Sequence, residues 1–166
     1  MQLSVSEILI KADNEPTAEA RKELLRKHVN NQGVITMLKL AYDPQFVFNL
    51  PVGTPPYKPC QFLDQEAMLY NNLRRMYLWL GEGNPGIPKA KREALFINLL
   101  ESLDPNDAIL LIAVKDKHLP YKNLTPDFIK EVFPGLLPDE VAKPILETVE
   151  DAPPVKRGPG RPKKKV

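Results

Sequence analysis

The sequence predicts an all-α protein: a compact bundle of about six or seven short helices with an extended proline-rich loop and a disordered basic C-terminal tail. Helix start signals recur along the chain, and apolar residues between them follow the helical period. The 18 prolines in 166 residues, about twice the average usage, keep the elements short. Because 43% of the residues are apolar, the chain can build one domain with a real core. We assign a helical domain to 1–147 and a linker with a basic arm to 148–166.

The first two helices are predicted from their N-caps. Ser4 and Glu7 form a capping box that opens a helix over about 4–13, and Asn14-Glu15-Pro16 ends it. Thr17 starts a second helix that extends to Asn30. The residues that we expect on its buried side are Ala20, Leu24, Leu25 and His28.

A third helix and a long loop follow. Gly33 marks a joint, and 34–42 form an apolar helix. The stretch 43–60 contains five prolines, each of which biases the preceding residue away from helix. We expect an extended loop there, held over the helices by its aromatic residues, with a brief strand at 46–48 as the alternative.

The second half of the chain repeats the same signals. Asp64 is predicted to cap a long helix over about 65–80, which Gly81 ends. A helix over 89–103 follows, and the residues that we expect to face inward are Ala94, Leu95, Ile97, Leu99, Leu100 and Leu103.

Proline at the first helical position then predicts the beginnings of two further helices. Asp104-Pro105 opens an apolar helix, and Thr125-Pro126 opens a short one that Pro134-Gly135 ends. Residues 139–147 are expected to add a last short turn.

Charge is distributed unevenly. The net charge of +2 combines six basic residues in 153–166 with a remainder of 17 basic and 21 acidic residues. Because an acidic body repels phosphate, we expect any nucleic-acid binding to reside in the arm.

Side chains for catalysis or metal binding are sparse. His28 and His118 have no metal-ligand spacing around them, and Cys60 is expected to be a core thiol. We predict no enzyme activity, no cofactor and no metal. The N-terminal residues lack the features of a signal peptide and no stretch has the length of a membrane span, so we expect no membrane association and a location inside the cell.

A tripeptide, Pro-Tyr-Lys, occurs in two predicted loops. Tyr57 and Lys58 lie in the proline-rich loop, and Tyr121 and Lys122 follow the apolar helix. A rigid proline-flanked segment can dock in a partner's groove in extended form. The alternative, which we favour for Tyr57, is that the tyrosine packs on the helices while the prolines stiffen a long connection.

The arm "PPVKRGPGRPKKKV" is the strongest functional signal. Its prolines and glycines favour an extended path, and a narrow A·T minor groove admits a thin arginine-bearing backbone but excludes a helix. The predicted DNA-binding residues are Lys156, Arg157, Gly158, Gly160, Arg161, Pro162, Lys163, Lys164 and Lys165.

The arm resembles the AT-hook, whose core is Pro-Arg-Gly-Arg-Pro inside flanking lysines. Gly160-Arg161-Pro162 and the lysines at 163–165 match it. The departure is that Pro159 and a glycine stand between the two arginines, which prevents a symmetric clamp. This weakens the expectation of A·T preference more than that of DNA binding.

Three segments, "LPVGTPPYKP", "REALFINLLESLDPNDAILLIAVKDKHLPYKNLT" and "GPGRPKKK", resemble an uncharacterised family of small proteins of T-even-like tailed phages. The resemblance implies a phage origin and a site of action in the cytoplasm of the infected cell, or in the virion. It assigns no catalytic residue.

Two function classes follow. The first is a non-enzymatic DNA-associated accessory protein whose helical body binds a protein of the transcription, replication or packaging machinery. The alternative is a structural or protein-interaction module whose tail is only a solubilising segment, or one that binds RNA or an acidic protein.

Overall fold

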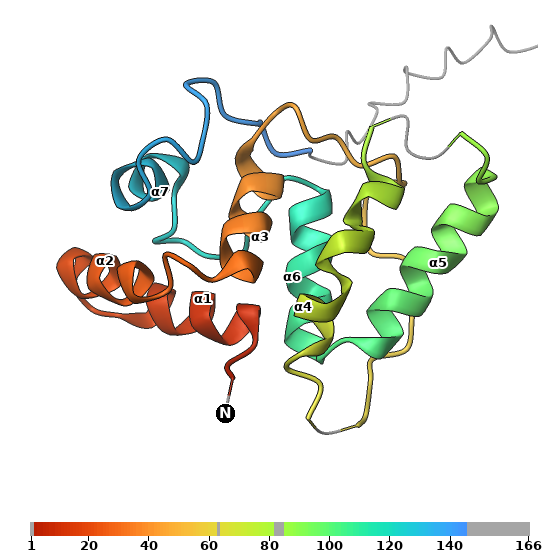
Figure 1. Cartoon of the computed structure of the whole chain (residues 1–166), viewed down its shortest axis with the longest axis horizontal. Helices are drawn as coiled ribbons and strands as arrows, with labels where there is room; N and C mark the ends of the chain where they lie inside the picture. Colours follow the sequence, from red (N-terminus) through yellow and green to blue (C-terminus); the bar gives the residue numbers. More distant parts are fainter. Residues whose placement is uncertain (1, 63, 82–84, 146–166) are drawn as a thin grey trace, which may run out of the picture.

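The computed structural model describes residues 2–62, 64–81 and 85–145 of the chain. Within these ranges the protein is all-α, as predicted (Figure 1). Its elements are α1 (Val5–Asn14), α2 (Ala18–Lys27), α3 (Gln32–Tyr42), α4 (Met68–Asn72), the 3₁₀ helix η1 (Leu73–Trp79), α5 (Lys89–Ser102), α6 (Pro105–Lys115) and α7 (Pro126–Val132).

Four of the five predicted side-chain caps are present, and the cap expected at Asp64 is not. Ser4 Oγ accepts from the Glu7 amide at 3.2 Å, and the Glu7 carboxylate accepts from the Ser4 amide at 3.1 Å, which completes the capping box. Thr17, Asp104 and Thr125 each accept from a backbone amide in the first turn of α2, α6 and α7. Local capping therefore fixes where these helices begin.

Helix α6 occupies the centre of the bundle. It packs against α1, α3 and α5, while α7 covers α2 and η1 contacts α5 (Figure 1). Its sides are buried nearly all round, which is the pattern of a helix inside a core. The fully buried residues of α6 include Asp107, Ala108, Leu110, Leu111 and Val114.

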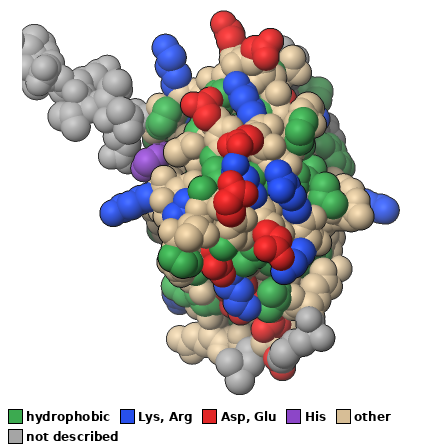
Figure 2. Space-filling view, turned by 90° about the vertical axis from the view of Figure 1, so that its left-hand side faces the viewer, with side chains coloured by type: hydrophobic (Ala, Val, Ile, Leu, Met, Phe, Trp, Pro, Cys, Tyr) green, Lys and Arg blue, Asp and Glu red, His purple; other side chains and the backbone are tan. Residues whose placement is uncertain are grey.

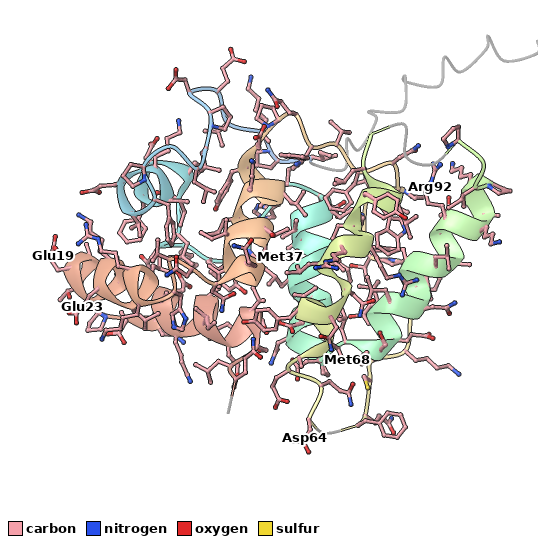
Figure 3. The ribbon with its side chains drawn as sticks, in the orientation of Figure 1. Glu19, Glu23, Met37, Asp64, Met68 and Arg92 are labelled. Carbon is pink, nitrogen blue, oxygen red and sulfur yellow. The ribbon has the colours of Figure 1, made fainter. Side chains whose placement is uncertain are left out.

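The predicted long helix over 65–80 is wrong. Asp64 has φ 62° and lies in the loop before α4 (Figure 3), and Ala67, which makes no side-chain cap, precedes the helix. Helix α4 ends at Asn72, whose side-chain Nδ2 donates to the Met68 carbonyl at 2.8 Å. That carbonyl is the usual acceptor for the Asn72 amide, so the side chain competes with the α-helical ladder and the chain continues as 3₁₀ helix.

Smaller boundaries also differ. Helix α2 ends at Lys27 instead of Asn30, and His28, expected on the buried side, is its partly buried C-cap. Ala94 is exposed, whereas Arg92 and Phe96 of the same helix are buried. The turn predicted over 139–147 is only a bend at 139–140, and 146–147 lie outside the described residues.

The proline-rich loop is extended, as predicted. It makes an isolated antiparallel bridge between Phe48 and Leu80, with Asn49 N donating to Trp79 O and Gly81 N to Val47 O, both at 2.7 Å. Gly81, at φ 58°, turns the chain away after η1. The loop is thereby tied to the C-terminal end of η1.

Gly33 lies inside α3, not at a joint before it, where the side chains of Val5 from α1 and Tyr70 from α4 lie against the α3 backbone. A Cβ there would meet Tyr70 Cε1 at 2.5 Å and Val5 Cγ2 at 2.6 Å. The absent side chain therefore sets the spacing of α3 against α1 and α4.

We predict that Gly33→Ala lowers the free energy of unfolding by about 1–2 kcal/mol net, because an overpacking cost of about 2–3 kcal/mol outweighs the ~1 kcal/mol gain in helix propensity. Urea denaturation measures this. Ala94→Gly, on the exposed side of α5, should cost only the propensity difference of about 1 kcal/mol. A Gly33→Ala protein as stable as the wild type would contradict the assigned close approach.

Candidate functional site: a basic groove and a proline-rich loop

The predicted DNA-binding residues, Lys156 to Lys165, lie outside the described part of the chain. The last described segment is attached to the body at two points. Ala142 N donates to Tyr42 O at 2.7 Å, and Ile145 N donates to Asp116 O at 2.9 Å. The described chain therefore ends beside the C-terminal ends of α3 and α6.

The proline-rich loop covers a cavity of about 300 Å³ against α5 and α6. Loop residues 50–56 form one wall, and Glu93, Phe96 and Ile97 of α5 form the other. Lys115 Nζ donates to Pro51 O at 2.7 Å and to Asp116 Oδ1 at 2.5 Å, and Asp116 Oδ2 accepts from Gly53 N at 3.1 Å. One buried ion pair thus holds the loop by its backbone.

The two Pro-Tyr-Lys tripeptides both place tyrosine inward and lysine outward. Tyr57 packs against the core, while Lys58 is exposed and its backbone amide donates to Glu101 Oε1 at 3.0 Å. Tyr121 is partly buried, and burial raises the pKa of its phenol, with Asp107 and Asp13 adding to the rise. Lys122 is exposed. Partner binding at these loops stays a prediction.

A groove lies between α3 and the α4–η1 segment, and we call it the α3–η1 groove. Two adjoining hollows of about 390 and 470 Å³ share Gln32, Thr36, Leu73 and Arg74. The apolar side chains that line the first hollow are Ile35, Leu40, Phe46, Leu73, Met76, Tyr77 and Leu80. Lys39 and Arg74 are the charged residues of the lining, and no acid lines it among the described residues.

Sequence reasoning missed this groove. Its residues come from two elements far apart in the chain, and one of them was expected to be a regular helix. The signal present in the sequence was Arg74 and Arg75 close to Tyr77, a basic and aromatic cluster on an otherwise apolar segment.

Two buried ionisable groups serve the fold. Asp107, in the first turn of α6, is fully buried, and its Oδ1 accepts from Ser6 N of α1 at 2.9 Å. Burial raises the pKa of this carboxyl, and hydrogen bonds from Ser6 oppose the rise. Lys117, at φ 57°, donates from Nζ to the carbonyls of Leu40 and Asp43 at the end of α3. Neither group lines a hollow described above.

Reactive residues do not form a cluster. Cys60 is a partly buried free thiol, and His118 is exposed after α6. In the part of the chain that the structure describes, no group of three or more His, Cys, Asp or Glu residues could hold a metal ion. None of the described helices is long and apolar enough to span a bilayer.

The fold and the groove together define a small helical protein with an apolar, basic-edged groove and an extended proline-rich loop. The chain belongs to a family described as "Family of unknown function (DUF6433)", which residues 8–121 match. This confirms that it is a member of an uncharacterised family. The matched range includes the loop, the α3–η1 groove and α6, and it ends before the arm. Comparison with curated proteins found no match.

The pH dependence of stability tests whether burial lowers the pKa of Lys117. Burial lowers its pKa to about 8 from 10.5, against an opposing contribution from Asp43. Above pH 8 the folded chain binds fewer protons than the unfolded chain, so the free energy of unfolding should rise with pH. We predict a gain of about 1–2 kcal/mol between pH 7.5 and 9.5, measured by urea denaturation.

Lys117→Met keeps the aliphatic stem and removes the ammonium group, so this variant should lack the gain. The range stays below pH 10 because the pKa of Tyr42 is raised to about 12 and the tyrosines add the opposite slope at higher pH. If the free energy of unfolding changed equally with pH in the wild type and in Lys117→Met, the lowered pKa of Lys117 would be contradicted.

Proposed function

We propose that this chain is a non-enzymatic accessory protein of a tailed phage that associates with DNA through the arm 153–166 while its helical body binds a protein partner. One observation carries the proposal: the arm holds six basic residues and no acid, whereas the remaining residues include 17 basic and 21 acidic ones. Because the basic excess of the chain lies in the arm, we expect the attraction to phosphate to reside in this short segment.

The covalent structure of the arm supports DNA over a generic charge run. Glycine beside Arg161 removes side-chain bulk, so that the backbone can follow the floor of a narrow minor groove. Lys163, Lys164 and Lys165 would then meet phosphates where the chain leaves the groove.

The affinity expected for a single arm is low. Six phosphate contacts correspond to a slope of about −5 in log K against log salt. A single arm binds in the range of non-specific contacts, with Kd on the order of 10⁻⁴ to 10⁻⁶ M. Useful occupancy therefore requires several arms in one assembly or a body already docked near DNA.

The body contributes the second contact in this proposal. Figure 2 shows acidic and basic side chains interspersed over the face at the α2 and α7 end, without a large area of one sign. On that face, the ion pair between Lys22 and Glu131 at 2.5 Å joins α2 to α7. The more distinctive surfaces of the described body are the proline-rich loop and the α3–η1 groove, and both suit a protein partner better than DNA.

A phage source is part of the proposal. It is supported by the resemblance of "LPVGTPPYKP", the stretch 92–125 and "GPGRPKKK" to proteins of T-even-like phages. The partner would then belong to the transcription, replication or packaging machinery in the infected cell, or to the virion.

The alternative is an interaction module with a generic basic tail. It is favoured by the departure of the arm from the AT-hook, since Gly158-Pro159-Gly160 separates the arginines where the AT-hook has one glycine, and this prevents a symmetric clamp. The two functions differ in what the arm does on DNA.

We predict that the full chain binds duplex DNA with a salt slope of about −5, and that replacing all six arm lysines and arginines by glutamine abolishes this binding. Fluorescence anisotropy with A·T-rich and G·C-rich duplexes across a salt series measures both. Equal affinity of the wild type and the neutral-arm variant would contradict the proposal.

Single arm variants then separate the two functions. If the arm enters the minor groove, Arg161→Ala weakens binding to the A·T-rich duplex more than Lys164→Ala does, because only the arginine reaches the groove floor. Equal effects of both variants, with no preference between duplexes, would leave a generic basic tail.

A further inference from the structure

The floor of the α3–η1 groove is aliphatic. Ile35 and Leu40 of α3 face Leu73, Met76 and Leu80 of the opposite wall, and the two walls pack directly on one another through α3 and α4. A floor of this kind gains free energy by covering apolar surface, and it suits the apolar face of an amphipathic helix.

The edges of the groove are basic. Lys39 lies on the α3 side and Arg74 on the η1 side, and no acid lines either hollow among the described residues. The body as a whole has more acids than bases outside the arm, so the groove is a local reversal of sign. An occupant with acidic residues on both sides of an apolar stripe would complement these edges.

The aromatic residues do not provide a platform for nucleic-acid bases. The Lys39 ammonium lies over the ring of Phe46, 5.6 Å from its centroid, and so covers one face of that ring. Of the aromatic residues that line the groove, Tyr77 is the exposed one, with 62% of its surface accessible. Stacked single-stranded nucleic acid uses successive exposed rings, whereas one ring at the edge of an aliphatic floor suits an apolar side chain of a peptide.

We propose that the α3–η1 groove binds an acidic amphipathic helix of a partner protein, with apolar residues on its floor and carboxylates paired to Lys39 and Arg74. This inference rests on the proposed function only in assuming that the body has a protein partner. The partner's helix would be acidic, and therefore opposite in charge to the groove edges. The arm itself carries the same sign as the groove edges and is not its occupant.

Anisotropy with a synthetic peptide tests the proposal on the full chain. The probe is a labelled peptide of about 15 residues with leucine at i, i+3, i+4 and i+7 and glutamate along both sides of the stripe. The control peptide has lysine in place of every glutamate. We expect saturable binding of the acidic peptide that weakens with salt, and at least about tenfold weaker binding of the lysine peptide.

The protein variants locate the site. Lys39→Glu with Arg74→Glu should weaken binding of the acidic peptide by about tenfold or more. The matched control is Lys11→Glu with Arg26→Glu, which reverses two exposed cations on α1 and α2 and should leave affinity within about twofold. Arg74→Glu alone, at an exposed position outside the Lys39–Phe46 contact, gives a partial loss and shows that the effect is not one of misfolding.

Each other outcome overturns the proposal. Equal loss in the control variant would mean attraction to the whole surface. Competition by single-stranded oligothymidine, lost in Tyr77→Ala, would make the groove a nucleic-acid site. Peptide affinity that falls as protein concentration rises, with dimers in sedimentation, would make the occupant a second copy.

The same variants keep this inference separate from the proposed function. Reversal of Lys39 and Arg74 should leave the arm-dependent salt slope on duplex DNA unchanged, and the neutral-arm variant should still bind the acidic peptide. If the peptide fails to bind while arm-dependent DNA binding persists, only the groove inference is wrong. If the arm fails while the peptide binds, only DNA association is wrong.

Discussion

The buried carboxylate of Asp107 joins the N-terminal ends of α1 and the central helix α6, and this contact holds α1 against the helix on which α3 and α5 also pack. It lies in the first turn of α6 and accepts from the Ser6 amide of α1, 101 positions away. Because both helix N-termini are positively polarised, one acidic group serves both and fixes α1 on the central helix. Val5 of α1 and Tyr70 of α4 then meet at Gly33, and this contact sets the distance between the walls of the α3–η1 groove.

Anchors at the opposite end of the bundle hold the loops in a similar way. Lys117 binds the last carbonyls of α3, and the pair Lys115–Asp116 holds the proline-rich loop by its backbone. Two buried cations at the C-terminal end of the central helix, Lys115 and Lys117, thus hold the proline-rich loop and the end of α3. The buried charges of Asp107, Lys115 and Lys117 each bind backbone groups.

How much the sequence predicts depends on the range of the interaction. Ser4 with Glu7, and Asp104 with Pro105, act within one turn, so their helix starts could be predicted. The 65–80 helix could not, since the side chain of Asn72 competes for a backbone carbonyl and the bridge of Phe48 to Leu80 fixes the end of η1. The groove needs the long-range approach of α3 and α4, which no local pattern carries. The basic composition of the arm, by contrast, is a property of the sequence itself, and its binding to DNA stays a prediction.

We propose that DNA and a protein partner bind separate parts of one chain. The most direct test is a set of ¹H–¹⁵N correlation spectra of the full chain with the acidic peptide, with an A·T-rich duplex, and with both together. We predict peptide shifts confined to amides of α3, α4 and η1, duplex shifts confined to 153–166, and their sum in the ternary sample. Duplex shifts spread over the helical body, or displacement of the peptide by the duplex, would contradict the claim.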